Sequence, residues 1–191
     1  MILGITGGSG SGKTTLLRIL KDAGFTILDC DAIYHSLLET DKAMLRAIEE
    51  RFPSSFPDGK LDRKKLGGIV FLDPEALQDL NLITHYHVKN KVLALLPASP
   101  ALAAIDAIGL FEGGLAQLCD VTVAVTAPLE QRVQRLMARD GISEEYARSR
   151  IAAQLTDAEF AERSDYTLDN NSTKEDFQIK CLAFLKDIGI I

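Results

Sequence analysis

The stretch Gly7-Gly8-Ser9-Gly10-Ser11-Gly12-Lys13-Thr14 decides the fold of this chain. It fits the phosphate-binding pattern G-x-x-x-x-G-K-[ST], which requires a strand before the loop and a helix after it. The flanking residues meet this requirement, because Met1–Thr6 reads as a short buried strand and Thr14–Ala23 as a helix ended by Gly24. The alternative, a glycine-rich turn followed by a chance Lys-Thr pair, is disfavoured by this context.

The chemistry of phosphate binding explains the residue types in this loop. Its glycines let backbone N–H groups converge on phosphate oxygens, at a helix N-terminus that already favours negative charge. Lys13 can reach the β- and γ-phosphates, and the Thr14 hydroxyl can hold Mg²⁺. The sequence therefore predicts a site for a nucleoside triphosphate. The candidate loop residues are Gly8, Ser9, Gly10, Ser11, Gly12, Lys13, Thr14 and Thr15.

Composition narrows the class of protein. The 191 residues suit one α/β domain, and the net charge of −6 indicates neither a nucleic-acid scaffold nor a membrane-surface protein. The three cysteines are far apart and form no C-x-x-C pair, so we expect reduced thiols and a cytoplasmic location. The N-terminal apolar run is short and has no basic leader, so we expect no signal peptide or spanning helix. We expect a monomer or a weak homo-oligomer that acts on a small molecule.

Strands alternate with helices along the chain, which predicts a parallel, doubly wound sheet in a three-layer α/β/α arrangement. The further strands are expected at Phe25–Leu28, Ala101–Ala107, Val121–Val125 and Tyr166–Leu168. The prediction is a single domain, 1–191, with a core formed by 1–31, 98–128 and 155–191. A helical insertion at 32–97 is too long for a simple crossover and is expected to bind the substrate. Thr173–Lys186 reads as an amphipathic helix packed on the sheet.

Two aspartates follow the second strand, where ligands bind in open parallel sheets. A carboxylate at Asp31 can accept a proton from an attacking hydroxyl or orient water on Mg²⁺. The alternative is that Asp31 only caps a helix starting at Ala32. For Asp29 the functional and structural interpretations are evenly balanced.

A pair of helices over 129–154 carries five arginines and no lysine. Helical spacing places Arg132, Arg135 and Arg139 on one stripe, with Val133, Leu136 and Met137 facing elsewhere. Gly141 ends the first helix, and Ser143 caps the second. Because the guanidinium fork suits phosphate oxygens, we interpret the segment as an arginine-rich lid, with Arg135 and Arg139 as the best candidates for phosphate contacts. The alternative is a solvated helix pair held by surface ion pairs such as Glu145–Arg148.

Two weaker patterns in the sequence have structural explanations as well as functional ones. His85 and His87 alternate as two metal ligands would, but no third ligand is evident. Asp106-Ala-Ile-Gly109 imitates the D-x-x-G of a GTPase switch, although the guanine-reading Asn-Lys-x-Asp is absent. Asp106 can approach Mg²⁺ or substrate, but strand-end capping is the simpler interpretation.

From end to end the chain resembles dephospho-coenzyme A kinases. The phosphate loop resembles the opening of that family, and Asp29-Cys-Asp31 its Asp-Ala-Asp element, whose second aspartate is the base on the acceptor hydroxyl. Further matching segments are Leu61–Phe71 and Leu80–His85 in the insertion, Arg135, Arg139-Asp140 and Ala153-Gln154 in the lid, and Asp165 and Asp169-Asn170 near the last strand. The departures are His35 for an arginine, Tyr86 for a proline, and Ile108-Gly109 within a Pro-Leu-Leu-x-Glu element. All of them lie on the acceptor side.

The resemblance implies an ATP-dependent kinase that phosphorylates the ribose 3′-hydroxyl of dephospho-coenzyme A, in coenzyme A biosynthesis. It implies catalytic roles for Asp31, Lys13 and Arg139, acceptor contacts at Arg63 and His85, and ATP with Mg²⁺ as cofactors. The alternatives are another P-loop kinase of the uridine kinase type or a nucleotide-binding switch. The short chain and the Asp-Cys-Asp element argue against the former, and the arginine-rich lid against the latter.

Overall fold

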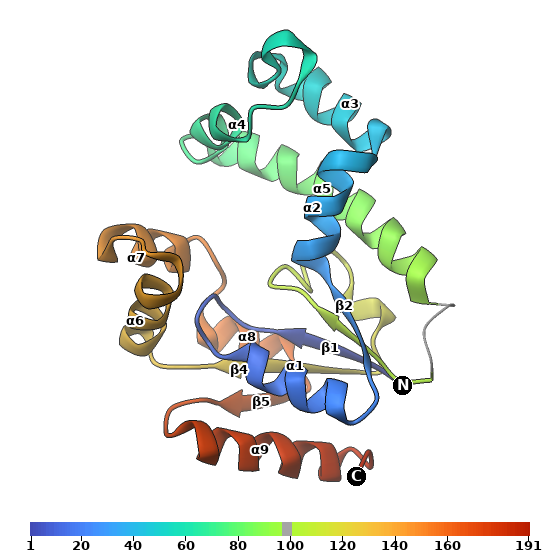
Figure 1. Cartoon of the computed structure of the whole chain (residues 1–191), viewed down its shortest axis with the longest axis vertical. Helices are drawn as coiled ribbons and strands as arrows, with labels where there is room; N and C mark the ends of the chain where they lie inside the picture. Colours follow the sequence, from blue (N-terminus) through green and yellow to red (C-terminus); the bar gives the residue numbers. More distant parts are fainter. Residues whose placement is uncertain (97–100) are drawn as a thin grey trace. The chain divides into compact units, whose positions relative to one another are not determined.

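The computed structural model describes residues 1–96 and 101–191. The chain forms two compact units (Figure 1). One, the sheet unit, contains Met1–Leu28, Ser99–Phe111 and Leu115–Ile191, and the other, the helical unit, contains Asp29–Ala98 and Glu112–Gly114. The expected boundary between 97 and 98 lies outside the described residues.

The sheet unit is built on five strands in the order β2-β3-β1-β4-β5. Their bounds are β1 Ile2–Thr6, β2 Thr26–Asp29, β3 Ala103–Asp106, β4 Val121–Thr126 and β5 Tyr166–Asp169. The pairings β1–β3, β1–β4 and β4–β5 are parallel, so the phosphate loop after β1 emerges at the carboxyl edge of the sheet, beside the ends of β3 and β4. This confirms the expected α/β fold, and each described strand lies within two residues of its predicted bounds.

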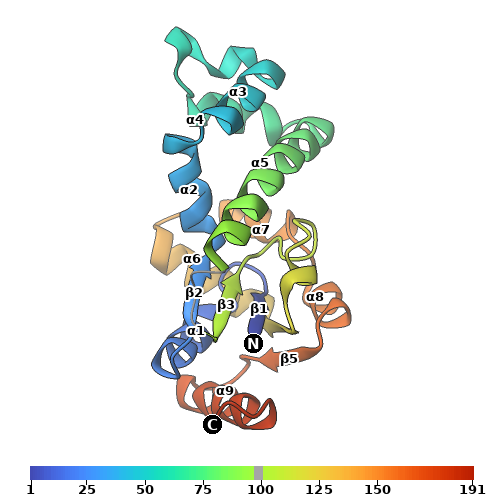
Figure 2. The same ribbon diagram turned by 90° about the vertical axis from the view of Figure 1, so that its right-hand side faces the viewer.

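Helices cover both faces of this sheet (Figures 1 and 2). Helices α1 (Lys13–Asp22) and α9 (Lys174–Asp187) pack on one face, and α8 (Asp157–Arg163) on the other. The α1–α9 face buries Leu3 and Ile5 of β1 against Leu16 and Leu20 of α1, all of them fully buried. Each such side chain contributes about 1.5–3 kcal/mol when buried, so this layer fixes the base of the phosphate loop.

The helical unit is organised around one long helix, α5 (Pro74–Leu95). Helices α2 (Cys30–Thr40), α3 (Lys42–Arg51) and α4 (Arg63–Val70) all pack against α5, as Figure 2 shows. Its buried positions recur every four residues, at Ala76, Leu80, Thr84, Val88 and Val92. Two short 3₁₀ turns, Pro53–Ser55 and Pro57–Gly59, lie between α3 and α4.

Helices α6 (Leu129–Asp140) and α7 (Glu144–Ala152) form a pair within the sheet unit. Gly141 ends α6 with a φ of 65°, and the Ser143 side chain accepts a hydrogen bond from Tyr146 N–H, as predicted. The pair has a small core of its own, made by Val133, Leu136, Ala147 and Ile151. The predicted division of faces was wrong at two positions, because Met137 is 36% exposed whereas Arg132 is only 3% exposed.

Candidate functional site

The phosphate loop needs glycine for steric reasons at three positions. Gly7, Gly10 and Gly12 have φ values of 130°, 78° and 103°, which side chains rarely adopt. A Cβ on Gly7 would collide with the Val125 carbonyl of β4, and a Cβ on Gly12 with the Asn170 side chain. The loop is therefore packed closely against the elements beside it.

Within the described residues, no side chain caps the start of helix α1. Its N-cap, Gly12, provides no side-chain cap, and no acidic residue lies in its first turn. By contrast, the side chains of Asp29, Asp41, Asp62 and Asp73 cap α2, α3, α4 and α5. The first-turn donors of a helix need partners, and a phosphate supplies them with the charge that the helix dipole favours.

Three side chains, two from α6 and one from the residue after β5, hold carbonyl groups of the loop. Arg132 Nε donates to the Ser9 carbonyl at 3.0 Å, Arg135 Nη1 to the Gly10 carbonyl at 3.0 Å, and Asn170 Nδ2 to the Ser11 carbonyl at 2.7 Å. Because consecutive carbonyls are engaged by these donors, the loop conformation is fixed before any ligand arrives. A fixed set of donors costs little reorganisation when charge develops on a phosphate.

Lys13, Thr14 and Thr15 occupy the first turn of α1. Lys13 Nζ donates to the Gly7 carbonyl at 2.6 Å, so the ammonium group lies against the loop. Thr14 is exposed, whereas the Thr15 N–H already donates to the Gly12 carbonyl at 3.0 Å. Within residues 1–96 and 101–191, no cluster of three or more His, Cys, Asp or Glu side chains could hold a metal. A threonine hydroxyl without a protein cage suits Mg²⁺, which keeps waters and binds substrate phosphates.

The arginines of α6 and α7 all have protein partners. The ion pairs join Arg139 and Arg150 to Asp140, and Arg148 to Glu130 and Glu144. The Glu145–Arg148 pair named under the alternative interpretation does not form, because Arg148 pairs with Glu130 and Glu144 instead. The Arg139 hydrogen bond, with that of Arg150, lowers the pKa of Asp140 to about 2. Arg139 keeps a 61% exposed side chain, so its partner can exchange with solvent anions.

The two aspartates after β2 have different roles in the fold. Asp29 is the N-cap of α2, and its Oδ1 accepts a hydrogen bond from Ala32 N–H at 3.0 Å. The alternative that Asp31 caps this helix was therefore wrong, because α2 starts at Cys30 rather than Ala32. Asp31 lies exposed in the first turn, and in the part of the chain that the structure describes its carboxylate makes no hydrogen bond or ion pair. Of the two aspartates, Asp31 is the one that does not cap the helix.

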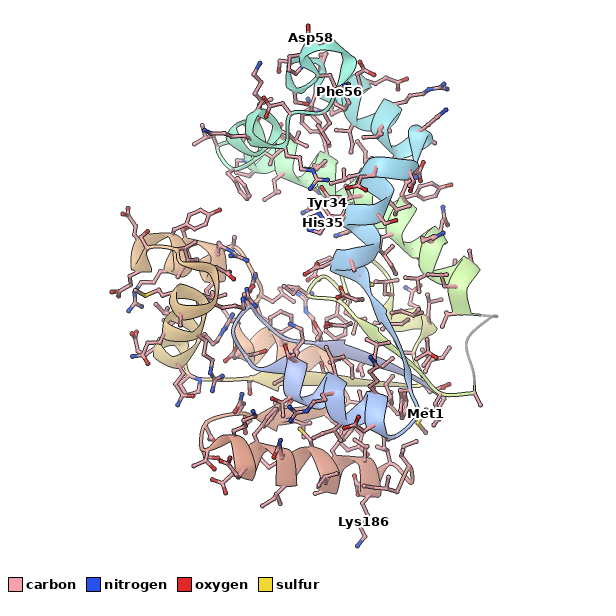
Figure 3. The ribbon with its side chains drawn as sticks, in the orientation of Figure 1. Met1, Tyr34, His35, Phe56, Asp58 and Lys186 are labelled. Carbon is pink, nitrogen blue, oxygen red and sulfur yellow. The ribbon has the colours of Figure 1, made fainter. Side chains whose placement is uncertain are left out.

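The helical unit also contains a cavity of about 410 Å³ beside Arg63. Four cationic side chains line it, together with Glu49, three leucines and Phe56. The cationic residues are Lys42, Arg46, Lys60 and Arg63. Burial raises the pKa of Tyr34 on α2, while the charge of Arg63 opposes that shift. Figure 3 marks Tyr34, the neighbouring His35 and Phe56. This pocket suits a ligand with both an anionic group and an apolar chain.

His85 and His87 do not form a metal site. His87 Nδ1 lies 2.8 Å from Asp41 Oδ2, where it links α5 to the N-cap of α3. His85 is half-buried; burial lowers its pKa, and contacts with Glu112 oppose the shift. The two histidines therefore have separate partners within the helical unit.

Two residues that support the loop, Asn170 and Gln154, were part of the family resemblance, but the residues themselves gave them no role. Asn170 follows β5 by one residue and is 159 positions away from Ser11, to which it donates. Gln154 follows α7 and exchanges hydrogen bonds with Ser9. The signal for Asn170 is its position at the carboxyl end of a parallel strand, where this fold gathers polar side chains. For Gln154 the signal was the Ala153-Gln154 match to the family's lid, which gave no contact with Ser9.

The fold and the phosphate loop define the class: a P-loop nucleoside-triphosphate-binding protein with a parallel sheet. The dephospho-CoA kinase family model matches residues 1–176. A dephospho-CoA kinase of Thermus thermophilus is 35% identical over 189 residues, covering 98% of this chain and 92% of that protein. A crystal structure from Thermus thermophilus, also 35% identical, superposes with a TM-score of 0.83 and covers 98% and 97% of the two chains. A dephospho-CoA kinase structure from Campylobacter jejuni gives a TM-score of 0.66 at 27% identity, covering 98% and 96%.

The chain belongs to the dephospho-CoA kinase family. It is therefore a kinase that phosphorylates dephospho-CoA to give CoA, and a kinase of this family uses ATP. No helix within residues 1–96 or 101–191 is long and apolar enough to cross a membrane.

Proposed function

We propose that this kinase transfers the γ-phosphoryl group of ATP to the ribose 3′-hydroxyl of dephospho-CoA and that Asp31 takes the proton of that hydroxyl. The observation that carries the proposal is the difference between the two aspartates: Asp29 is occupied as a helix cap, whereas Asp31 is exposed in the first turn of α2. A carboxylate that accepts no intramolecular hydrogen bond keeps its oxygens for an acceptor hydroxyl.

On the ATP side, N–H groups of the loop and the Lys13 ammonium hold the triphosphate; the N–H groups of Ser9 and Ser11 are not among them, because they donate to Gln154 and to the Gly8 carbonyl. The uncapped start of α1 and the fixed loop carbonyls support this role. The Thr14 hydroxyl would hold Mg²⁺ together with phosphate oxygens, and the ion would neutralise charge on the transferring group. Arg135 and Arg139 stabilise the same charge, and Arg139 exchanges Asp140 for phosphate when it does so.

On the acceptor side, Arg63 and His85 contact dephospho-CoA. The cavity beside Arg63 supports this role, because its cations suit the diphosphate of the acceptor and its leucines suit the pantoyl arm. His35 and Tyr86 depart from the family pattern. Since both belong to the segments that the resemblance assigns to the acceptor, they affect which acceptor is bound rather than the binding of ATP. We place the activity in the cytoplasm, in keeping with the free thiols of Cys30, Cys119 and Cys181.

An acceptor panel tests the proposal. ADP release is measured with dephospho-CoA, uridine, adenosine and pantetheine, each at equal concentration with ATP and Mg²⁺. We expect rapid release only with dephospho-CoA. Preference for uridine would favour a nucleoside kinase, and equal release without any acceptor would favour a nucleotide-hydrolysing switch.

A further inference from the structure

Ser9 of the phosphate loop is held through all of its polar groups by the α6–α7 pair. Its N–H donates to Gln154 Oε1 at 2.8 Å, and Gln154 Nε2 donates to its Oγ at 2.7 Å. Its carbonyl accepts from Arg132 Nε at 3.0 Å. Ser9 is 7% exposed, so water does not replace these partners readily.

The two partners of Ser9 stand at the two ends of the helix pair. Arg132 lies in the first turn of α6, and Gln154 follows the end of α7 at Ala152. Between them the pair has a small core of its own. Ser9 is therefore the residue of the loop through which both ends of the pair are attached.

Arg132 is held in place by an ion pair with Asp157 as well as by its bond to Ser9. Its Nη1 donates to Asp157 Oδ1 at 2.8 Å, and Asp157 Oδ2 in turn accepts from Ala127 N–H at 3.3 Å. The Arg132 side chain is 4% exposed, and burial lowers its pKa while Asp157 opposes that shift. Gln154, by contrast, has Ser9 as its close side-chain partner and only a 3.4 Å contact from Arg132 Nη2. A substitution of Gln154 removes its hydrogen bonds to Ser9 and leaves no buried charge unpaired, whereas a substitution of Arg132 would leave Asp157 without its ion-pair partner.

We propose that Gln154 is a positioning residue for phosphoryl transfer: it acts through Ser9 to hold the first half of the phosphate loop in the form that binds ATP. The inference rests on the proposed role of this loop as the ATP site. Without the carboxamide, the Ser9 N–H remains buried and without an acceptor, and the loop must rearrange to satisfy it. The cost falls on ATP binding and not on the acceptor, since the acceptor residues belong to the helical unit.

Gln154→Leu tests this, because leucine has a similar size and no hydrogen-bonding group. Gln134→Leu is the matched control: the same change on an exposed residue of α6. We measure the Kd of a non-hydrolysable ATP analogue and the KM values for ATP and dephospho-CoA. For Gln154→Leu we expect the Kd and the KM for ATP to rise roughly 5- to 100-fold, with the KM for dephospho-CoA unchanged. The control should match wild type.

A double-mutant cycle separates positioning from general stability. Ser9→Ala removes one of the two bonds to Gln154, so its Kd for the analogue should also rise, and the combined variant should lose less than the sum of the two effects. Additive effects, or an unchanged Kd in folded Gln154→Leu, would overturn the proposal. Should Gln154→Leu not fold, Ser9→Ala decides the matter, and an unchanged Kd would then overturn it. These binding results do not depend on the acceptor, so failure of the acceptor panel is distinguishable from failure here.

Discussion

Substitutions of Asp29 and Asp31 should separate the structural aspartate from the catalytic one. Asp29→Ala removes the cap on Ala32 N–H and should lower the free energy of unfolding by about 1 kcal/mol, within a range of about 0.5–2. Asp29→Asn should leave stability and turnover nearly unchanged, because asparagine caps as well as aspartate. Asp31→Asn loses only a first-turn charge, worth below about 1 kcal/mol, but transfer should fall roughly 10²- to 10⁴-fold.

Two assays check these values. Urea unfolding gives the change in free energy, and in a chain of this length a change of 1 kcal/mol moves Tm by about 2–4 °C. Coupled ADP release gives turnover, and binding of an ATP analogue should change much less than turnover in Asp31→Asn. Normal turnover in Asp31→Asn, with an inactive Asp29→Asn, would show that the wrong aspartate had been chosen. A loss of stability in Asp31→Asn equal to that of Asp29→Ala would mean a structural role for Asp31.

Three further outcomes are expected. Lys13→Ala should lower transfer by orders of magnitude with the fold intact, and wild-type turnover in the folded variant would contradict the phosphate assignment. Amide hydrogen exchange across 129–154 should slow when a non-hydrolysable ATP analogue binds. Exchange that is equally slow with and without the analogue would mean that α6 and α7 form a rigid helix pair. Arg139→Ala should impair phosphoryl transfer more than it impairs ATP binding. Burial would raise the pKa of Asp41, but bonds from Met44 N–H and His87 outweigh it and lower that pKa. The stability from Asp41 is therefore present above pH of about 4 and lost as the pH falls through the lowered pKa. Asp41→Asn, which keeps a cap, should weaken this acid dependence in urea titrations; an unchanged dependence would contradict it.

The strands could be predicted because strands of a parallel sheet are buried on both faces and appear as short apolar runs. The choice between Asp29 and Asp31 as helix cap could not, because both residues cap helices equally well. Which of them does so depends on where β2 ends, at Asp29, and that is fixed by its place beside β3 in the sheet. The residues around Asp29 do not indicate how β2 pairs with β3.

The arginine segment shows the same limit for side chains. Helical spacing groups Arg132 with Arg135 and Arg139, yet Arg132 is buried beneath Ser9 while Arg139 is exposed. The phosphate loop could be predicted because the residues that form it are consecutive in the sequence. The hydrogen bond between Gln154 and Ser9 could not be predicted, because the two residues are 145 positions apart and meet only in the folded sheet unit.

The most direct test of phosphoryl transfer to the ribose is the identity of the product. Wild-type protein is incubated with ATP, Mg²⁺ and dephospho-CoA, and the products are separated and examined by ³¹P NMR and mass spectrometry. One CoA should form for each ADP, with the new phosphomonoester on the ribose 3′-oxygen. ADP without CoA, or a phosphate on another hydroxyl, would contradict the proposed reaction.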